Sequence, residues 1–338
     1  MKRGVWVVLV VLLVLAVIAG LAGGSVPLSI AEVLGALFGR GDAAVSDGAT
    51  NVAGSANAEV IVRGLRLPRV ALAVVVGAGL AASGTALQAT LRNPLAEPYL
   101  LGVSGGAAVG AVCSVVLGLT APGLLPLVAF AGAALAVLLV LLVARASGAH
   151  ADPRVLLMAG VVVGAFCNAA IMVALATAPE NTVRGALWWM MGSVADAQWS
   201  TVRAIAGYVA VGIGLLIWWG RDIDVLALGE DAAASLGLDV ERATRRVYLT
   251  ASLLAAATVA GAGLIGFVGL LVPAIARAFG ARTTRETVLA ASVAGAALVV
   301  AADLAARTLL RPAELPLGAV TAIIGVPFFL WRLRSATR

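Results

Sequence analysis

The stretch RNPLAEPYLLGVSGG, residues 92–106, stands between two long apolar runs. It contains an arginine, an asparagine, a glutamate, two prolines and three glycines. The residues on either side, 70–89 and 107–119, are mostly Ala, Val, Leu and Gly. Apolar runs of this length predict membrane-spanning helices, so the stretch itself predicts a connection between two of them.

The residue types in this stretch predict how the connection is built. Prolines stop helices, and asparagine can cap or turn the chain. Glycines let the next helix start tightly, or break near its beginning, against neighbouring helices. An ordinary loop would have a similar spacing, and the pattern alone leaves both possibilities open. The positions predicted to break the helices are Asn93, Pro94, Pro98, Gly102 and Gly105.

The rest of the chain repeats the apolar pattern. Of its 338 residues, 62% are hydrophobic and 12% are charged, whereas a soluble domain has about a quarter charged residues. This composition predicts an all-α polytopic membrane protein with a single transmembrane domain over residues 1–338. Residues 39–62, rich in small and polar residues, are expected to form a flexible outer loop. Ten spans are expected, at residues 5–22, 68–90, 99–119, 123–144, 155–178, 201–219, 246–263, 265–279, 287–305 and 316–331.

The basic residues predict the orientation of the spans. If the N-terminus is cytoplasmic, most of the 23 lysines and arginines fall on the cytoplasmic side, as positive-inside topology requires. Both termini and the segment 221–246 are then cytoplasmic, and the protein is expected in the inner (cytoplasmic) membrane. The net charge of +6 therefore reflects topology and does not indicate a nucleic-acid partner.

Several classes of function are excluded by residue types that the sequence hardly contains. Lys2 is the only lysine, so the chain has no phosphate-binding loop of the ATPase type. His150 is the only histidine, so neither a histidine metal site nor a catalytic triad is expected. No catalytic residue, metal or cofactor is therefore predicted. A secondary carrier is the alternative class of transporter, but it would need polar ligands at mid-membrane, and Asp303 is the clearest acidic residue within a span.

The polar segment 221–246, between the sixth and seventh spans, is the best candidate for a partner contact. Gly229 and Gly237 bracket a short helix, and Glu230 and Asp231 lie at its N-terminus, where the helix dipole favours acids. A short, capped helix fits a groove in a partner protein. A helix lying on the membrane surface would have a similar pattern.

Three arginines expected on the outer side also suggest a contact. Arg66 and Arg69 precede the second span, and Arg307 follows the ninth. A cationic rim would attract acidic groups on a docking protein. Alternatively, Asp303 and Arg307 pair with each other across one helical turn, or Arg66 and Arg69 anchor a helix end at lipid headgroups.

Five stretches resemble the permease subunits of bacterial ABC importers for iron–siderophore complexes, haem and vitamin B12 (the FecCD-type, BtuC-like permeases). These are RLPRVALAVVVGAGLAASGTALQATLRNPLAEPYLLGVSGGAAVGA (66–111), GALWWMMGSVADAQW (185–199), LALGEDAAASLGLD (226–239), GAGLIGFVGLLVPAIAR (261–277) and ADLAARTLLRPAELPLGAVTAIIGVPFF (302–329). The family commonly has a histidine after the proline of GLLVP, where this chain has Ala274, so a role for that side chain is in doubt.

The resemblance implies a type II ABC importer permease fold of ten helices, working as a homodimer or close heterodimer. It also implies two copies of an ABC ATPase subunit and a periplasmic or lipid-anchored substrate-binding protein, whose glutamates would meet Arg66, Arg69 and Arg307. The expected substrate is an iron–siderophore complex, with vitamin B12 or haem as alternatives. The residues expected at the ATPase-coupling contact are Leu228, Gly229, Glu230, Ala234, Leu236 and Gly237.

Overall fold

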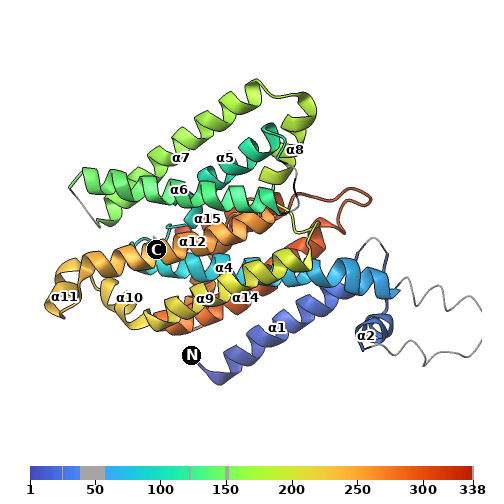
Figure 1. Cartoon of the computed structure of the whole chain (residues 1–338). Helices are drawn as coiled ribbons and strands as arrows, with labels where there is room; N and C mark the ends of the chain where they lie inside the picture. Colours follow the sequence, from blue (N-terminus) through green and yellow to red (C-terminus); the bar gives the residue numbers. More distant parts are fainter. Residues whose placement is uncertain (25, 39–57, 120, 122, 149–151, 337–338) are drawn as a thin grey trace, which may run out of the picture.

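The computed structural model of the chain describes residues 1–24, 26–38, 58–119, 121, 123–148 and 152–336. Every regular element within these residues is a helix (Figure 1). The helices are α1 (Arg3–Ala22), α2 (Ile30–Phe38), the π-helix η1 (Val60–Arg66), α4 (Leu67–Thr90), the 3-10 helix η2 (Pro98–Leu101), α5 (Val103–Val116), α6 (Leu124–Ala146), α7 (Pro153–Ala176), α8 (Glu180–Met190), α9 (Trp199–Trp218), α10 (Gly220–Leu226), α11 (Glu230–Ser235), α12 (Val240–Ala262), α13 (Val268–Ala278), α14 (Thr284–Ala306) and α15 (Leu317–Ala336).

These helices confirm the predicted class, an all-α polytopic membrane protein. Among the described residues, six helices are long and apolar enough to cross a membrane: α1, η1 with α4, α6, α7, α9 and α14. The shorter apolar helices are α5, α13 and most of α15. Together with α12, they correspond to the ten spans expected from the sequence. α12 begins at Val240, before the predicted start at 246, because the Asp239 side chain caps it by accepting the Arg242 amide at 3.0 Å.

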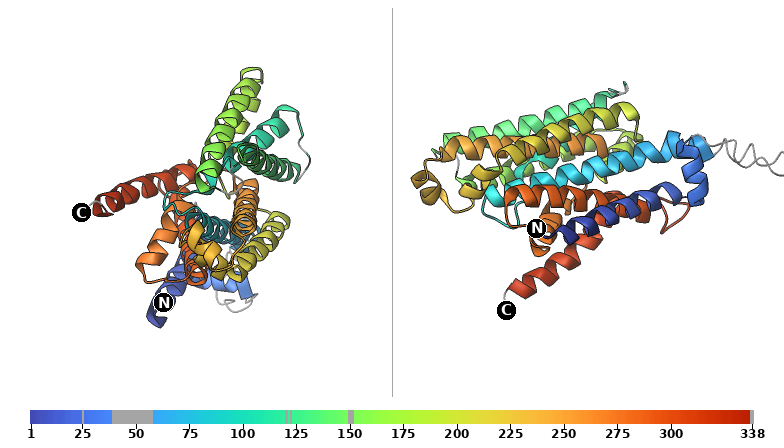
Figure 2. Two further views of the ribbon diagram at one scale, coloured as in Figure 1. Left: turned by 90° about the vertical axis from the view of Figure 1, so that its left-hand side faces the viewer. Right: turned by 90° about the horizontal axis from the view of Figure 1, so that it is seen from below.

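The long helices run side by side, so the bundle has two ends (Figure 1). The end that holds α10 and α11 is called the α11 end here, and the end that holds α2 and α8 is called the α8 end. α1 starts at the α11 end, where the Met1 amino group pairs with Glu286 near the start of α14 at 2.6 Å. Both views in Figure 2 show α15 diverging from the bundle toward its C-terminal end.

Helix α4 is the most buried span of the bundle. Within η1 and α4, 78% of the most apolar window is buried, compared with 17% in α1 and 33% in α7. Its many small residues explain this position, because they let neighbouring backbones approach closely. Gly77 of α4 meets Gly295 of α14, and Gly84 of α4 meets Gly269 of α13. A methyl group on Gly77 or Gly84 would overlap backbone atoms of the facing helix.

The outer helices have large exposed apolar faces. On α7, for example, Val162, Phe166 and Met172 are 64%, 69% and 71% exposed. The large exposed side chains of α1 and α6 are also mainly aliphatic, whereas those of α9 include Trp199, Tyr208 and Trp218. Such faces need lipid or another subunit to cover them, in agreement with a chain that spans a membrane several times.

Some helices were not expected from the sequence. α2, η1 and α8 lie outside the ten predicted spans. Residues 39–57 of the predicted flexible loop lie outside the described residues, but residues 58–62 are helical, which corrects the end of that loop. Tertiary contacts explain why these residues are helical. Val62 is fully buried, and the Arg63 Nε atom donates to the Ala36 carbonyl near the end of α2 at 2.6 Å.

The glycine contacts generate a prediction about stability. Gly77→Ala should lower the free energy of unfolding by about 2 kcal/mol, because the added methyl group forces α4 away from α14. Gly214→Ala in α9 is the matched control, since no atom lies within 4 Å of the place that its methyl group would take. Thermal unfolding of the detergent-purified variants measures both effects. Equal melting temperatures for the two variants would contradict the close contact between α4 and α14.

Candidate functional site

A short helix protrudes at one end of the bundle (Figure 1). Gly229 precedes α11 and Gly237 follows it, with φ angles of +113° and +83° that favour glycine. Leu228 and Leu236 flank the helix and are 66% and 65% exposed. Two large apolar side chains on a protruding turn form a surface suited to a partner protein.

The residues expected from the sequence at an ATPase contact lie together on this protrusion. Five of the six are exposed and the sixth, Gly229, is partly exposed. Glu230 and Asp231 occupy the first turn of α11, as expected. The six residues are Leu228, Gly229, Glu230, Ala234, Leu236 and Gly237, and we call their combined surface the α11 surface.

The base of the α11 surface is fixed to the bundle by polar contacts. Asp224 of α10 accepts hydrogen bonds from the amide and the hydroxyl of Thr284, at 2.7 and 2.6 Å, and so binds the start of α14. Asp222 of α10 pairs with Arg246 of α12. The Arg246 guanidinium also lies 5.1 Å from the centre of the Trp219 ring. Helix α10, which directly precedes α11, is therefore bound to both α12 and α14.

The connection between α4 and α5, residues 91–102, also lies at the α11 end. The predicted break residues Asn93, Pro94, Pro98 and Gly102 all lie in it, and Gly102 has a φ angle of +79°. The Asn93 side chain accepts a hydrogen bond from the Leu95 amide at 2.9 Å, which forms a tight turn. Gly105 differs from the expectation because it continues α5 and does not break it. It packs against α7, where the Cys167 Cβ atom lies 2.9 Å from the place that a methyl group on Gly105 would take.

Two side chains of this connection hold the interruption between α12 and α13. The Ile265 amide donates to the Tyr99 hydroxyl oxygen at 2.6 Å. The Phe267 amide donates to the Glu97 carboxylate at 2.7 Å. Phe267, which precedes α13, has a φ angle of +67°, a left-handed conformation that is uncommon for an aromatic residue.

A third polar side chain supports α13 itself. Pro273 lies inside α13 and has no N–H, so the carbonyl of Gly269 loses its helical donor. The Gln88 side-chain amide of α4 donates to the carbonyls of Gly269 and Leu270, at 3.2 and 3.1 Å. Its oxygen accepts a hydrogen bond from Arg277 at 2.5 Å. Sequence reasoning did not identify Gln88, although a polar residue in an apolar span is a usable signal.

The three arginines expected at a docking rim lie together near the α8 end. Arg69 pairs with Asp303 at 2.8 Å and with Glu314 at 3.0 Å, and Arg307 pairs with Asp303 at 3.3 Å. Arg66 donates to the carbonyls of Leu21, Ala22 and Val26, at and just beyond the end of α1. Arg307 also donates to the Gly20 carbonyl. The predicted alternative, a pair between Asp303 and Arg307, is therefore present.

The three arginines differ in how deeply they are buried. Arg66 and Arg307 are only 5% and 6% exposed, because the end of α1 covers them. Arg69 has a partner, Glu314, whose side chain is 47% exposed. All three arginines line a cavity of about 400 Å³, together with Glu314. Arg69 and Glu314 are therefore the part of this cluster nearest to an approaching partner.

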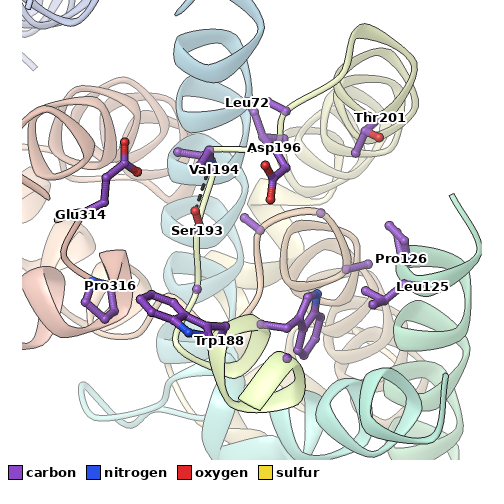
Figure 3. Close-up of a pocket in the computed structure, with 18 of the residues that line it drawn as sticks. Leu72, Leu125, Pro126, Trp188, Ser193, Val194, Asp196, Thr201, Glu314 and Pro316 are labelled. Carbon is purple, nitrogen blue, oxygen red and sulfur yellow. Dashed lines mark hydrogen bonds between the residues drawn. The ribbon is translucent and has the colours of Figure 1, made fainter. Parts of the chain in front are cut away.

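The α8 end also contains the largest of the described cavities, about 570 Å³ (Figure 3). Trp188 and Trp189 of α8 line it, together with Ser193, Asp196 and Glu314. Trp188 is 56% exposed. The position of both tryptophans in this cavity depends on the orientation of α8.

A third cavity, of about 400 Å³, lies beside the interruption between α12 and α13. Tyr99, Gly266 and Phe267 line it, together with Met191 at the end of α8 and Ala322 of α15. Its wall therefore includes Phe267, whose amide the Glu97 side chain binds, and Tyr99 itself. Within the described residues, no group of three or more His, Cys, Asp and Glu side chains could hold a metal ion.

Comparisons with known proteins agree with this architecture. A solved metal-chelate type ABC transporter in an inward-facing conformation superposes with a TM-score of 0.81 over 99% of both chains, at 24% identity. This likeness shows the fold, that of type II ABC importer permeases. It agrees with the arrangement of α1, α4–α7, α9 and α12–α15 as ten spans.

Sequence relatives extend the agreement beyond the fold. The cobalamin import system permease protein BtuC of Halobacterium salinarum is 41% identical over 82% of this chain and 74% of its own length. The Fe(3+)-citrate import system permease protein YfmE of Bacillus subtilis is 35% identical over 93% of each chain. The model of the FecCD transport family matches residues 12–335. The chain is therefore a multi-pass membrane permease that belongs to the FecCD transport family.

Proposed function

We propose that this chain is the permease subunit of an ABC importer that moves an iron–siderophore complex, or a related metal chelate, across the cytoplasmic membrane. Its proposed partners are two copies of an ABC ATPase subunit, an external substrate-binding protein and a second copy of the permease. The α11 end, with both termini, then faces the cytoplasm. The observation that carries the proposal is the exposed α11 surface on a FecCD-family permease.

The α11 surface supports an ATPase contact. Its two exposed leucines would be buried in a partner groove, and the acidic first turn of α11 adds charge complementarity at the rim. The contacts of α10 with α12 and α14 would carry a movement of α11 into the membrane. Because Lys2 is the only lysine, the chain has no phosphate-binding loop of its own, which agrees with a separate ATPase subunit.

The acidic residue within the spans does not support a secondary carrier. Asp303 is 2% exposed and binds both Arg69 and Arg307. A carboxylate held by two arginines is a poor site for a coupling proton or cation, because ion binding would have to break both pairs. Because Asp303 is already paired, the cluster favours a transporter that takes its energy from a separate ATPase subunit over one that is coupled to an ion gradient.

The exposed faces of the outer helices support a dimer. The large apolar side chains of α7 would be covered by lipid or by a second copy. A substrate pathway between two copies would need a wall on each of them. The residues that line the cavity between the α12–α13 interruption and α15, among them Tyr99 and Phe267, would supply such a wall.

An iron–siderophore complex is the proposed substrate because YfmE, which covers nearly the whole chain, has a name that assigns it to Fe(3+)-citrate import. Vitamin B12 is the second candidate because the relative from H. salinarum, at 41% identity, is named a cobalamin permease. Haem is a further alternative within the same family.

The proposed coupling contact makes a prediction. Glu230→Arg and Gly229→Pro should leave the permease folded but uncouple ATP hydrolysis from uptake. The first reverses the charge at position 230, and the second abolishes the φ angle of +113° at position 229. We expect at least a tenfold loss of ATP-dependent uptake in proteoliposomes that contain the ATPase. The wild-type chain alone should not accumulate substrate.

The matched control for coupling is Glu180→Arg in α8. Glu180 is also exposed and also lies in the first turn of a short helix, but at the α8 end. This variant should bind the ATPase with wild-type affinity. Normal ATP-driven uptake in both α11 variants would remove the coupling role of the α11 surface.

The proposed docking contact makes a second prediction. An acidic group on the binding protein would have to displace Glu314 from Arg69. Arg69→Gln should therefore weaken docking about tenfold, whereas Glu314→Gln should strengthen it, and high salt should reduce both effects. Arg66 and Arg307 would act by holding the end of α1 beside Arg69.

Surface plasmon resonance with the cognate binding protein measures this docking at low and high salt. Arg184→Gln is the control because Arg184 is exposed on α8 and pairs only with Glu180 among the ion pairs of the described residues. Thermal unfolding of each variant shows whether the fold is retained. Unchanged affinity of a folded Arg69→Gln variant at low salt would refute the docking role.

The substrate assignment makes a third prediction. With its binding protein and ATPase, the reconstituted permease should accumulate a ferric siderophore, and excess cobalamin should not compete. The measurement is uptake of radioactive iron in the presence of increasing cobalamin. Uptake of labelled cobalamin without uptake of iron would assign the chain to vitamin B12 instead.

A further inference from the structure

We infer that residues 92–99 form a stiff link that joins the α11 surface to the start of α13, with Glu97 and Tyr99 as positioning residues. Through this link, a displacement of α11 would move the wall of the cavity beside α13. The inference rests on the proposed function only in assigning the source of that displacement to an ATPase. We call residues 92–99 the link.

At its first end, the link contacts α11 directly. The Arg92 guanidinium pairs with Glu230, the first residue of α11, at 3.1 Å, and both side chains are about half exposed. Arg92 has a φ angle of +49°, so its backbone is held in a left-handed conformation. A methyl group on Gly229 would lie 3.3 Å from the Arg92 guanidinium, so little space remains between the link and the start of α11.

The body of the link has little conformational freedom. The Asn93 amide donates to the Gln88 carbonyl at 3.1 Å, and the Asn93 carbonyl accepts the Ala96 amide at 3.0 Å. Ala96 is fully buried. Pro94 and Pro98 each fix one φ angle. A link of this kind transmits a movement of one end to the other instead of absorbing it.

At its second end, the link holds α13 through two backbone amides. Glu97 and Tyr99 accept the amides of Phe267 and Ile265, at 2.7 and 2.6 Å. Neither amide lies within a helix, so these side chains satisfy donors that the interruption leaves without helical partners. A carboxylate at the start of α13 is also favoured by the helix dipole. The position of Phe267 is therefore set by the link.

Phe267 in turn contacts α15, so a shift of Phe267 would also shift that helix. Two of its ring carbons lie 2.7 and 2.8 Å from the place that a methyl group on Gly325 would take, so the ring packs directly on the α15 backbone. Tyr99, Gly266 and Phe267 all line the cavity beside α13. Movement of the link would therefore change both the cavity wall and the contact with α15.

Helix α12 is the other route from α11 to the same cavity, but it stops before α13. α12 ends at Ala262, and Gly263 follows with a φ angle of +68°. The turn at Gly263 lets α12 move without carrying α13 rigidly. The link is thus the connection that sets α13, and Gln88 of the same α4–α5 region supports α13 from its side.

Hydrogen exchange of the purified full-length chain in nanodiscs tests the second end of the link. Glu97→Ala should speed exchange of the Phe267 amide at least tenfold, and Tyr99→Phe should do the same for Ile265. Glu97→Gln should stay within about twofold of the wild type, because its side-chain oxygen also accepts a hydrogen bond. Exchange of buried α4 amides reports on the fold. Unchanged exchange at Phe267 in a folded Glu97→Ala variant would overturn the positioning role.

The same measurement tests transmission from α11. Arg92→Glu should speed exchange at Ile265 and Phe267 about threefold, the scale expected for an exposed ion pair. The charge swap Arg92→Glu with Glu230→Arg should restore it. Arg184→Glu, which breaks a similar exposed pair in α8, is the control and should have no effect. No change in Arg92→Glu, or no recovery in the swap, would overturn the link.

The two hypotheses fail in different ways. If ATP-dependent uptake depends on the α11 surface but Arg92→Glu does not change hydrogen exchange at Ile265 and Phe267, the inference about the link is wrong and the proposed function stands. If exchange responds as expected but the wild-type permease needs no ATPase for accumulation, the link stands and the proposed function is wrong.

Discussion

In an apolar environment, every backbone amide and carbonyl needs a partner within the protein, and this requirement organises the interruptions between the helices of this chain. At the end of α1, the carbonyls accept hydrogen bonds from Arg66. In α13, Gln88 satisfies the carbonyl that Pro273 leaves without a donor. Between α12 and α13, Glu97 and Tyr99 accept the amides. Each interruption thus recruits a polar side chain from another part of the chain, and these recruited groups connect segments that the sequence separates.

The arginine cluster shows how one set of residues serves structure and interaction together. Arg66 and Arg307 bind carbonyls of the α1 terminus, which keeps them buried. Arg69 bridges the buried Asp303 and the half-exposed Glu314. Asp303 is the shared partner of Arg69 and Arg307, so its removal would leave two partly or fully buried arginines without it and should destabilise the fold. Only its outer edge, at Arg69 and Glu314, is available to respond to a partner.

Packing divides the molecule into parts that differ in freedom of movement. The glycine contacts of α4 with α13 and α14 bring backbones into direct contact, so these helices cannot slide past each other without overlap. The interruption at residues 263–267 and the diverging end of α15 have no such backbone-to-backbone lock with α4 (Figure 2). Conformational change is therefore expected around a rigid core of α4, α13 and α14, at residues 263–267 and at α15.

The sequence by itself determined the positions of the spans, the break near residues 92–98 and the short helix between Gly229 and Gly237, because apolar length, proline, glycine and charge act locally along the chain. It also separated α12 from α13 at residue 264, but it did not reveal α2 or α8, which are too short to be recognised as spans. Only the tertiary structure decided the partners of Arg66, Gln88 and Glu97. The backbone groups that these side chains bind lie 40 to 182 residues away, and which buried backbone groups lack a hydrogen bond is known only after the helices have packed.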